Sequence, residues 1–167
     1  MLREAHVWCG RATKTTLWGM VGSTIFGNYT DDVKRAVVMA QGESRWMMHD
    51  SYIGPEHLLL GLIHAFPDAV VTVLGVRSDE VRDAIARFAS LGPPYTSASM
   101  PFTRGAMSAL RAAQGIAREL HSGHVGIEHL LFGVLSVHDD CLDQALAAAG
   151  VDRDSAQTRA MAARTQG

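Results

Sequence analysis

The residues best suited to chemistry occur in a motif that the chain contains twice. Residues 54–57 read Gly-Pro-Glu-His and residues 126–129 read Gly-Ile-Glu-His, and each is followed by Leu-Leu. A glutamate in the first turn of a helix stabilises the positive end of the helix dipole, and a Glu-His pair could also supply metal ligands. Neither copy reads His-Glu-x-x-His, so we predict no metal site and interpret the histidines as packed, hydrogen-bonded side chains. The two motifs thus supply the glutamates Glu56 and Glu128 and the histidines His57 and His129.

The cysteines give little support to nucleophilic catalysis or to a disulfide framework. Cys141 follows Asp139 and Asp140, whose negative charges disfavour a reactive thiolate. The other cysteine is Cys9, and no CxxC spacing occurs. Two free thiols are typical of a reducing cytoplasm. We therefore predict a cytoplasmic protein that is not an enzyme and that uses no cofactor.

The composition limits the classes of partner. The 167 residues carry a formal net charge of -2 and are 47% hydrophobic but only 7% aromatic. This charge gives no electrostatic case for binding nucleic acid or an anionic membrane. No run of 18 apolar residues occurs, so we predict no membrane span. The length is enough for one domain, or two very small ones, with an interior of Ala, Leu and Val.

Helical periodicity predicts the elements that position the two motifs, and the fold class is all-α with eight helices. Thr30 is expected to cap the first helix, and Gly75 and Gly150 are expected to end short helices in the two halves. Val81, Ile85 and Phe88 should share a core-facing side of one helix, and Leu120 should face inward from another. The expected helices cover residues 31 to about 48, 55–65, 69–74, 78–91, 104–121, the segment that starts at Gly-Ile-Glu-His, 139–149 and 152–164.

The duplicated motif marks two tandem repeats of four helices. We expect a first repeat over residues 26–91 and a second over 102–164, packed together as one domain. Residues 92–101 are rich in Gly, Pro and Ser and form the linker between them. Residues 1–25 differ in composition and are expected to form a disordered or loosely attached extension.

The two repeats differ in length by one residue at their start. Thr103 follows Thr30 by 73 residues, whereas Gly126 follows Gly54 by 72. The first repeat therefore has one extra residue in its first loop.

The order of these features resembles a known family. An aromatic-Thr pair, an Ala-Gln helix and the sequence Gly-x-Glu-His-Leu-Leu-x-Gly all occur twice, as in the Clp amino-terminal repeat domain. The chain resembles the amino-terminal domain of ClpC unfoldases over about residues 26–164. The resemblance implies a pseudo-twofold helical domain that receives substrates and adaptors for an unfoldase that feeds the ClpP protease. The ATPase motif Gly-x-x-x-x-Gly-Lys-(Ser/Thr) is absent from the sequence, so we expect a binding module without its motor.

The resemblance also implies two pockets for phosphoarginine, the mark on proteins destined for degradation. In ClpC-like domains the motif glutamate receives the guanidinium, and the threonine lies by the phosphate. Carried over to this chain, the pairs are Glu56 with Thr30 and Glu128 with Thr103. A carboxylate can accept the guanidinium fork, and helix N-terminal amides can bind a phosphate.

The two pockets are expected to differ in charge. The family often has an arginine two residues after the threonine, where this chain has Asp32 and Gly105. Asp31 and Asp32 would place negative charge near a phosphate, whereas Arg104 could partly replace the missing arginine. We therefore hypothesise that the Thr103/Glu128 pocket binds better than the Thr30/Glu56 pocket.

Three other interpretations stay open. The glutamates could serve only as first-turn carboxylates. Phe26 and Phe102 resemble aromatic residues that help actinobacterial relatives bind cyclic peptide antibiotics, so the protein could be a decoy that sequesters such antibiotics. It could also be a regulatory subunit that docks on a Clp ATPase without using the pockets.

Overall fold

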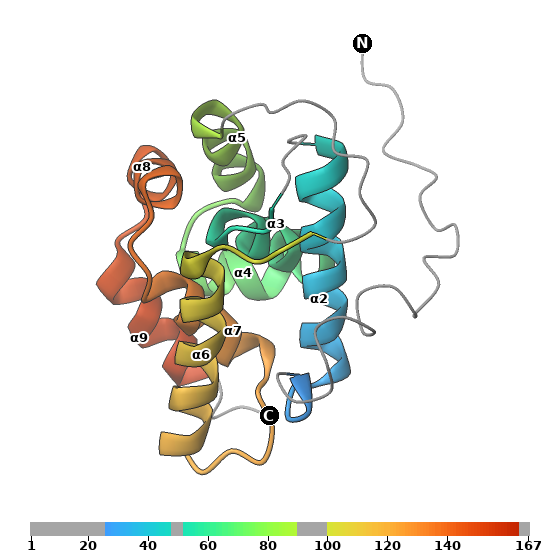
Figure 1. The fold of residues 1–167 in the computed structure, drawn as a ribbon. Coiled ribbons are helices and arrows are strands. Elements are labelled where there is room, and N and C mark those ends of the chain that lie inside the picture. Colours follow the sequence, from blue (N-terminus) through green and yellow to red (C-terminus); the bar gives the residue numbers. More distant parts are fainter. Residues whose placement is uncertain (1–25, 48–51, 90–99, 164–167) are drawn as a thin grey trace.

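The computed structural model describes residues 26–47, 52–89 and 100–163. Within these ranges the chain forms eight α-helices and no strand, as predicted, and a π-helical turn continues the first helix (Figure 1). The expectations for residues 1–25 and for most of the linker lie outside the described residues. The elements are α2 (Asp31–Gly42), η1 (Glu43–Met47), α3 (Pro55–Ala65), α4 (Pro67–Leu74), α5 (Ser78–Phe88), α6 (Arg104–Glu119), α7 (Ile127–Leu135), α8 (Asp140–Ala148) and α9 (Arg153–Ala163).

In each repeat the two leading helices pack closely at a glycine. α2 packs against α3, and α6 packs against α7. A Cβ at Gly61 of α3 would overlap the carbonyl oxygen of Ala36 and lie 2.6 Å from the amide nitrogen of Ala40. A Cβ at Gly133 of α7 would likewise overlap the carbonyl oxygen of Ala109. Since only glycine permits this approach, the second glycine of the repeated sequence serves helix packing.

The two repeats share contacts across their boundary. α4 of the first repeat packs against α9 of the second, and α5 packs against α8 (Figure 1). The buried hydroxyl of Tyr29 donates a hydrogen bond of 2.8 Å to the carbonyl oxygen of Leu110 in α6. Burial raises the pKa of Tyr29 well above its ordinary value. The buried apolar residues of both repeats form one continuous core.

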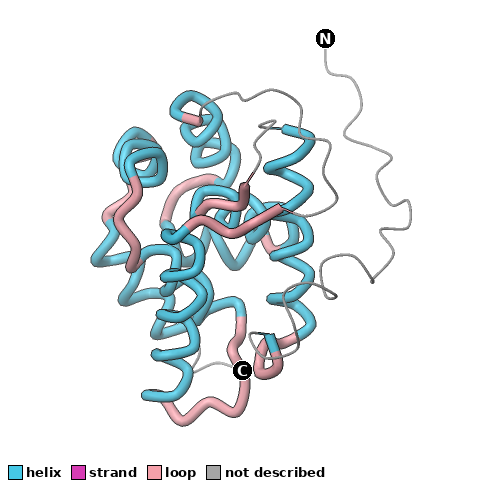
Figure 2. Tube along the Cα trace, in the orientation of Figure 1, coloured by secondary structure: helices cyan, strands magenta, loops and turns pink. Residues whose placement is uncertain are grey.

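Two parallel bridges connect the segments that precede the helices. Tyr29 pairs with Val125, and Ile53 pairs with Phe102. In Figure 2 the short loop segments before α3 and α6 lie side by side, and hydrogen bonds between their backbones hold them there. Each bridge therefore brings the first segment of one repeat to the motif of the other repeat.

The extra residue of the first repeat coincides with the π-helical turn. α2 has 12 residues and continues into the five residues of η1, whereas its counterpart α6 is a single α-helix of 16 residues. π-helical turns occur mostly as single turns in α-helices, and this one accompanies the one-residue difference in helix length. The expected α-helix over residues 31 to about 48 is therefore wrong in its last turn.

An ion pair with a buried carboxylate fixes this turn. The carboxylate of Glu43, only 5% exposed, accepts two hydrogen bonds of 3.1 Å from the guanidinium of Arg82 in α5. Nδ1 of His64 in α3 lies 3.1 Å from the same carboxylate. η1 is thereby joined to both α3 and α5.

Three smaller expectations need correction. α4 begins at Pro67, two residues before the expected start, because proline fits the first helical turn. Phe88 is 38% exposed, since Val81, Ala84 and Ile85 form the buried side of α5. Leu120 caps α6 at its C-terminus and is only half-buried.

Among the described residues, no single helix combines the length and apolar character needed to cross a membrane. α3 and α4 meet these criteria only when taken as a pair, and this pair is bent by 119°.

Candidate binding site

Each motif histidine caps its own helix. The backbone amide of Gly54 donates to Nδ1 of His57 at 3.0 Å, and that of Gly126 donates to Nδ1 of His129 at 2.9 Å. Histidine thus takes the place that Glu or Gln usually holds in a capping box. Both rings are buried, and Nε2 of His129 lies 3.4 Å from the hydroxyl oxygen of Ser122. The interpretation as packed, hydrogen-bonded histidines is confirmed.

Each motif glutamate folds back over the glycine before its helix. A Cβ at Gly54 would overlap the carboxylate of Glu56, and a Cβ at Gly126 would overlap that of Glu128. These carboxylates also lie 2.9 and 3.0 Å from Nδ1 of the following histidine. That nitrogen accepts an amide hydrogen, so the contact is not an ion pair. The side chains differ in access, because that of Glu56 is 6% exposed and that of Glu128 is 26% exposed.

The start of α6 lies beside the motif of the first repeat. The backbone amide of Thr103 donates a hydrogen bond of 2.9 Å to the carbonyl oxygen of Ile53, three residues before Glu56. A Cβ at Gly105 would lie 3.5 Å from the ring of Pro55, at the first position of α3. The first site therefore combines Glu56 with Thr103.

The start of α2 lies beside the motif of the second repeat. The backbone amide of Thr30 donates a hydrogen bond of 3.1 Å to the carbonyl oxygen of Val125, three residues before Glu128. The expected pairs, Glu56 with Thr30 and Glu128 with Thr103, are therefore wrong. Each site is built from both repeats, because the parallel bridges run between the repeats and not within them.

Both threonines cap their helices with the hydroxyl oxygen. Oγ1 of Thr30 accepts from the amide of Val33 at 3.3 Å, and Oγ1 of Thr103 accepts from the amide of Ala106 at 3.1 Å. A hydroxyl that accepts in this way still has its own hydrogen to donate. Together with the amides of the first helical turn, it gives each site groups that suit an anion.

The charges at the rims of the two sites are opposite. At the Glu128 site, α2 begins with Asp31 and Asp32. Asp31 pairs with Lys34 at 3.2 Å, and Asp32 pairs with Arg35, so both charges are partly compensated. At the Glu56 site, α6 begins with the exposed Arg104 and has no acidic residue in its first turn.

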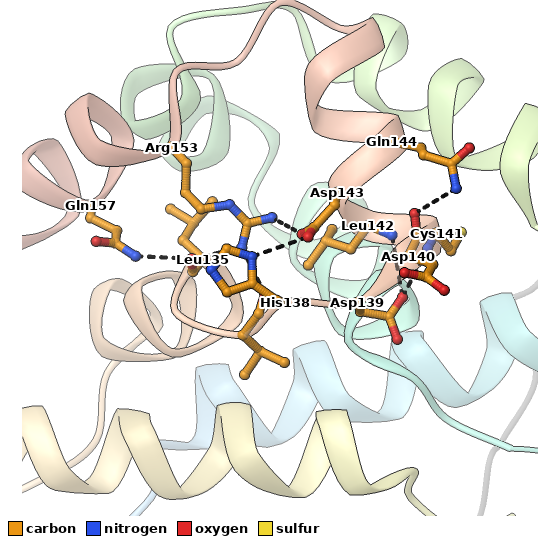
Figure 3. Close-up of polar contacts among 11 residues, drawn as sticks. Leu135, His138, Asp139, Asp140, Cys141, Leu142, Asp143, Gln144, Arg153 and Gln157 are labelled. Carbon is orange, nitrogen blue, oxygen red and sulfur yellow. Dashed lines mark hydrogen bonds and ion pairs between the residues drawn. The ribbon is translucent and has the colours of Figure 1, made fainter.

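A further carboxylate, Asp139, interacts electrostatically with Glu56, and sequence reasoning did not include it in a site. Its oxygen accepts from the amides of Cys141 and Leu142 at 3.1 and 3.3 Å and so caps α8 (Figure 3). Burial raises the pKa of Asp139, and the negative charge of Glu56 adds to this rise. An aspartate directly before a helix is a capping signal in the sequence, but its proximity to Glu56 depends on the packing of α8 on α3.

The loop between α7 and α8 is fixed by α9 (Figure 3). Arg153 donates to the carbonyl oxygens of Leu135 and Val137 at 3.0 and 2.6 Å. It also pairs with Asp143, which lies 3.1 Å from His138. Burial would raise the pKa of Asp143, but the hydrogen bond from His138 and the charge of Arg153 hold it below its ordinary value.

The expected hydrophobic surface at Phe26 and Phe102 does not form as predicted. Phe26 is only 3% exposed, and its ring centroid lies 5.1 Å from that of Tyr29 and 6.2 Å from that of Phe102. Phe26 is therefore a core residue, buried where the first repeat meets the second. Phe102 is half-buried.

The described part of the chain contains no group of three or more His, Cys, Asp or Glu side chains that could hold a metal ion. Cys141 is half-buried in the first turn of α8, and its backbone amide donates to the capping carboxylate of Asp139.

Comparison with known proteins relates the whole described region to one family. The family model described as the Clp repeat (R) N-terminal domain matches residues 28–149 and 101–166. Chaperone protein ClpC, chloroplastic, of Pisum sativum is 28% identical over 138 residues, which cover 81% of this chain and 15% of the relative. Chaperone protein ClpC3, chloroplastic, of Oryza sativa subsp. japonica is 35% identical over 120 residues, which cover 70% of this chain and 13% of the relative. The chain thus spans about 15% of the length of the curated relatives it matches.

Solved structures support the same fold. The N-terminal domain of the chaperone ClpD from Arabidopsis thaliana has a TM-score of 0.73 at 24% identity and covers 87% of this chain and 99% of that domain. The Hsp104 N-terminal domain from Candida albicans has a TM-score of 0.69 at 18% identity, with 84% and 93% covered. At these identities the likeness concerns the fold alone.

Proposed function

Because the chain belongs to the Clp repeat (R) N-terminal domain family, we propose that it is a non-catalytic binding module of a Clp protein-degradation system. Its ligands would be degradation signals on substrate proteins, of which phosphoarginine is the best fit, or adaptor proteins of the ClpC and ClpP type.

The observation that carries this proposal is that the capping threonine of each repeat is hydrogen-bonded to the segment directly before the glutamate motif of the other repeat. Phosphoarginine has guanidinium N–H donors at one end and a dianionic phosphate at the other. A carboxylate beside a hydroxyl donor and free helix N-terminal amides matches both ends of this group. The same arrangement occurs twice, so the chain has two candidate sites.

The Glu56 site should bind the ligand more tightly. Arg104 begins α6, whose N-terminus would hold the phosphate at this site, whereas Asp31 and Asp32 begin α2 at the Glu128 site. At partly solvated separations this difference is worth about 1 kcal/mol or more for a dianion, even with the partial compensation by Lys34 and Arg35. The greater exposure of Glu128 favours faster access but does not remove the repulsion. We therefore assign the stronger site to Glu56 and Thr103.

The test is calorimetric titration of the 167-residue chain with phosphoarginine, with equimolar arginine and phosphate as the ligand control. Glu56→Gln should weaken binding about tenfold, as expected for loss of a charge-assisted hydrogen-bond pair, and Glu128→Gln should weaken it less. Glu80→Gln is the matched control, because Glu80 is an exposed first-turn glutamate of α5.

Two results would oppose the proposal. If phosphoarginine binds no better than arginine with phosphate, the glutamates serve only to start their helices. If Glu80→Gln weakens binding as much as Glu56→Gln, binding depends on net charge and not on a site.

A further inference from the structure

A pocket of about 330 Å³ lies next to the Glu128 site. It is an open pocket, lined by the C-terminal part of α6, the loop from residue 120 to 126, and Asn28 of the first repeat. This loop and residues 26–30, the segment before α2, lie at the same end of the molecule in Figure 2, joined by the hydrogen bond from the amide of Val125 to the carbonyl oxygen of Asn28. The lining residues are Asn28, Gln114, Ala117, Arg118, Ser122, Gly123, His124 and Val125.

The polar groups of this pocket suit an anion. Arg118 and His124 are the ionisable residues of the lining, and neither is acidic. The Nε–H of Arg118 donates to the carbonyl oxygen of Gln114 at 3.3 Å, which orients the guanidinium and leaves its terminal N–H groups for a ligand. Asn28, Gln114 and Ser122 add neutral hydrogen-bonding side chains. This basic pocket contrasts with the net charge of -2 of the whole chain.

Backbone hydrogen bonds close the turn between α6 and the wall of the pocket. The amide of Ser122 donates to the carbonyl oxygen of Ala117 at 2.8 Å, and the amide of His121 donates to that of Arg118 at 3.0 Å. His121 has φ 54, the one positive φ among the described residues other than glycine. A non-glycine residue in this region costs free energy and is found disproportionately at binding sites.

We propose that this pocket binds the carboxylate of an acidic residue in a peptide segment of a protein ligand. Its volume is at the lower end of the range for ligand pockets, which suits one or two residues. Arg118 would receive the carboxylate, and the amide and hydroxyl side chains would bind the peptide backbone. Val125 lines the pocket, and the carboxylate of Glu128 lies over the next residue, Gly126. A peptide with an acidic residue near an arginine could therefore occupy both places.

The test uses a tripeptide, N-acetyl-Gly-Asp-Gly-amide, titrated into the isotope-labelled 167-residue chain and followed by backbone amide NMR shifts. The matched ligand is the same peptide with Asn in place of Asp. We expect the Asp peptide to bind about tenfold more tightly and to shift the amides of Ser122, Gly123 and Val125. Free succinate is the third ligand and separates a peptide carboxylate from a small carboxylate.

Two variants sharpen the result. Arg118→Gln should weaken the Asp peptide about tenfold and bring it close to the Asn peptide. Arg111→Gln, an exposed arginine two turns earlier on α6 and outside the pocket, should have no effect. Gly123→Trp should block the pocket, because Gly123 lies in its lining. The fold should tolerate this change, since a Cβ at Gly123 meets no atom within 4 Å.

Three outcomes would overturn the proposal. The first is equal binding of the Asp and Asn peptides, or none at millimolar concentration. The second is an equal loss in Arg111→Gln and Arg118→Gln, which would indicate general charge attraction. The third is tighter binding of succinate at the same amides, which would exclude a peptide as the ligand. None of these depends on phosphoarginine, so this proposal can fail while the proposed function stands, and the reverse also holds.

Discussion

The Glu56 and Glu128 sites have the same framework but different surroundings. In both, a glycine leaves space for the motif glutamate, a histidine caps the helix, and a second glycine lets the preceding helix pack closely. At the rim, however, one site has Arg104 and the other has Asp31 and Asp32. The residues that position the carboxylate are thus repeated in the duplication, while the residues that would select a ligand differ.

The shared framework can be broken most strongly at the close helix contacts. Gly61→Ala should destabilise the protein by about 2 kcal/mol, because overpacking outweighs the gain of about 1 kcal/mol in helix propensity. Gly133→Ala should cost somewhat less, since its Cβ would lie 3.0 Å from the amide nitrogen of Ala113, against 2.6 Å for the corresponding contact of Gly61. Urea unfolding of each variant gives the free energies.

Gly115 supplies the matched control for these two variants. It also lies in a helix, but a Cβ here meets nothing within 4 Å. Gly115→Ala should therefore stabilise the protein, by up to about 1 kcal/mol. If all three variants change stability in the same direction, helix propensity and not close packing decides the effect.

The next prediction concerns a feature that only the first repeat has. Glu43→Ala removes the carboxylate that joins η1 to Arg82, and it should cost about 2 kcal/mol. This value is below that of a fully buried pair, because the side chain of Arg82 is 30% exposed. The exposed pair of Arg77 and Asp79 is the control, and Arg77→Ala should not measurably change unfolding. A loss as small as that of the control would mean that η1 needs no ion pair.

The fold was largely predictable from the sequence because its signals are local. Helical periodicity, the capping threonines and the glycines that end α4 and α8 identified eight helices with small errors at their ends. The π-helical turn was not predicted, because the extra residue of the first repeat was expected in the loop after its first helix. Its conformation depends on Glu43, His64 and Arg82, which are distant in the sequence and meet only in the folded protein.

The binding residues stay a prediction, and the structure corrects only how they are paired. Carrying the family's pocket over repeat by repeat joined Glu56 to Thr30, because a tandem repeat suggests that each copy is complete in itself. The bridges between Tyr29 and Val125 and between Ile53 and Phe102 cross the repeat boundary instead. Such crossing cannot be read from sequence spacing, and neither can the burial of Phe26, which depends on the same boundary.

The difference between the rims can be sharpened by changing charge at one site at a time. In a Glu56→Gln background only the Glu128 site is intact. There the double variant Asp31→Asn and Asp32→Asn should raise the phosphoarginine affinity of the Glu128 site about threefold. In a Glu128→Gln background, Arg104→Gln should lower affinity by a similar factor. Calorimetry measures both. If the two backgrounds respond alike to Arg104→Gln, the cross-repeat pairing of Arg104 with Glu56 is wrong.

The smallest expected effect concerns Asp139, the carboxylate that interacts with Glu56. Its folded-state pKa is raised, so the folded protein holds the proton more tightly and stability falls as the pH rises through the interval from the ordinary value to the folded one. Asp139→Asn keeps an oxygen that can cap α8 and removes this penalty. The pKa of Asp139 is raised even though the amides at the start of α8 favour its charged form. Loss of the charge should therefore stabilise the protein slightly at neutral pH. It should have no such effect in strong acid, where Asp139 is protonated.

The Glu56 site differs here from the Glu128 site in a way that can be measured directly. Glu56→Gln should bring the pKa of Asp139 closer to its ordinary value in an NMR titration, because one of its causes is the charge of Glu56. Glu128→Gln should leave it unchanged. In the first repeat, the counterpart of Asp139 is Phe66, the N-cap residue of α4. Phe66 has no charge and makes no side-chain hydrogen bond to that helix. Bound guanidinium would favour the ionised Asp139, so phosphoarginine should lower this pKa only if it binds at Glu56.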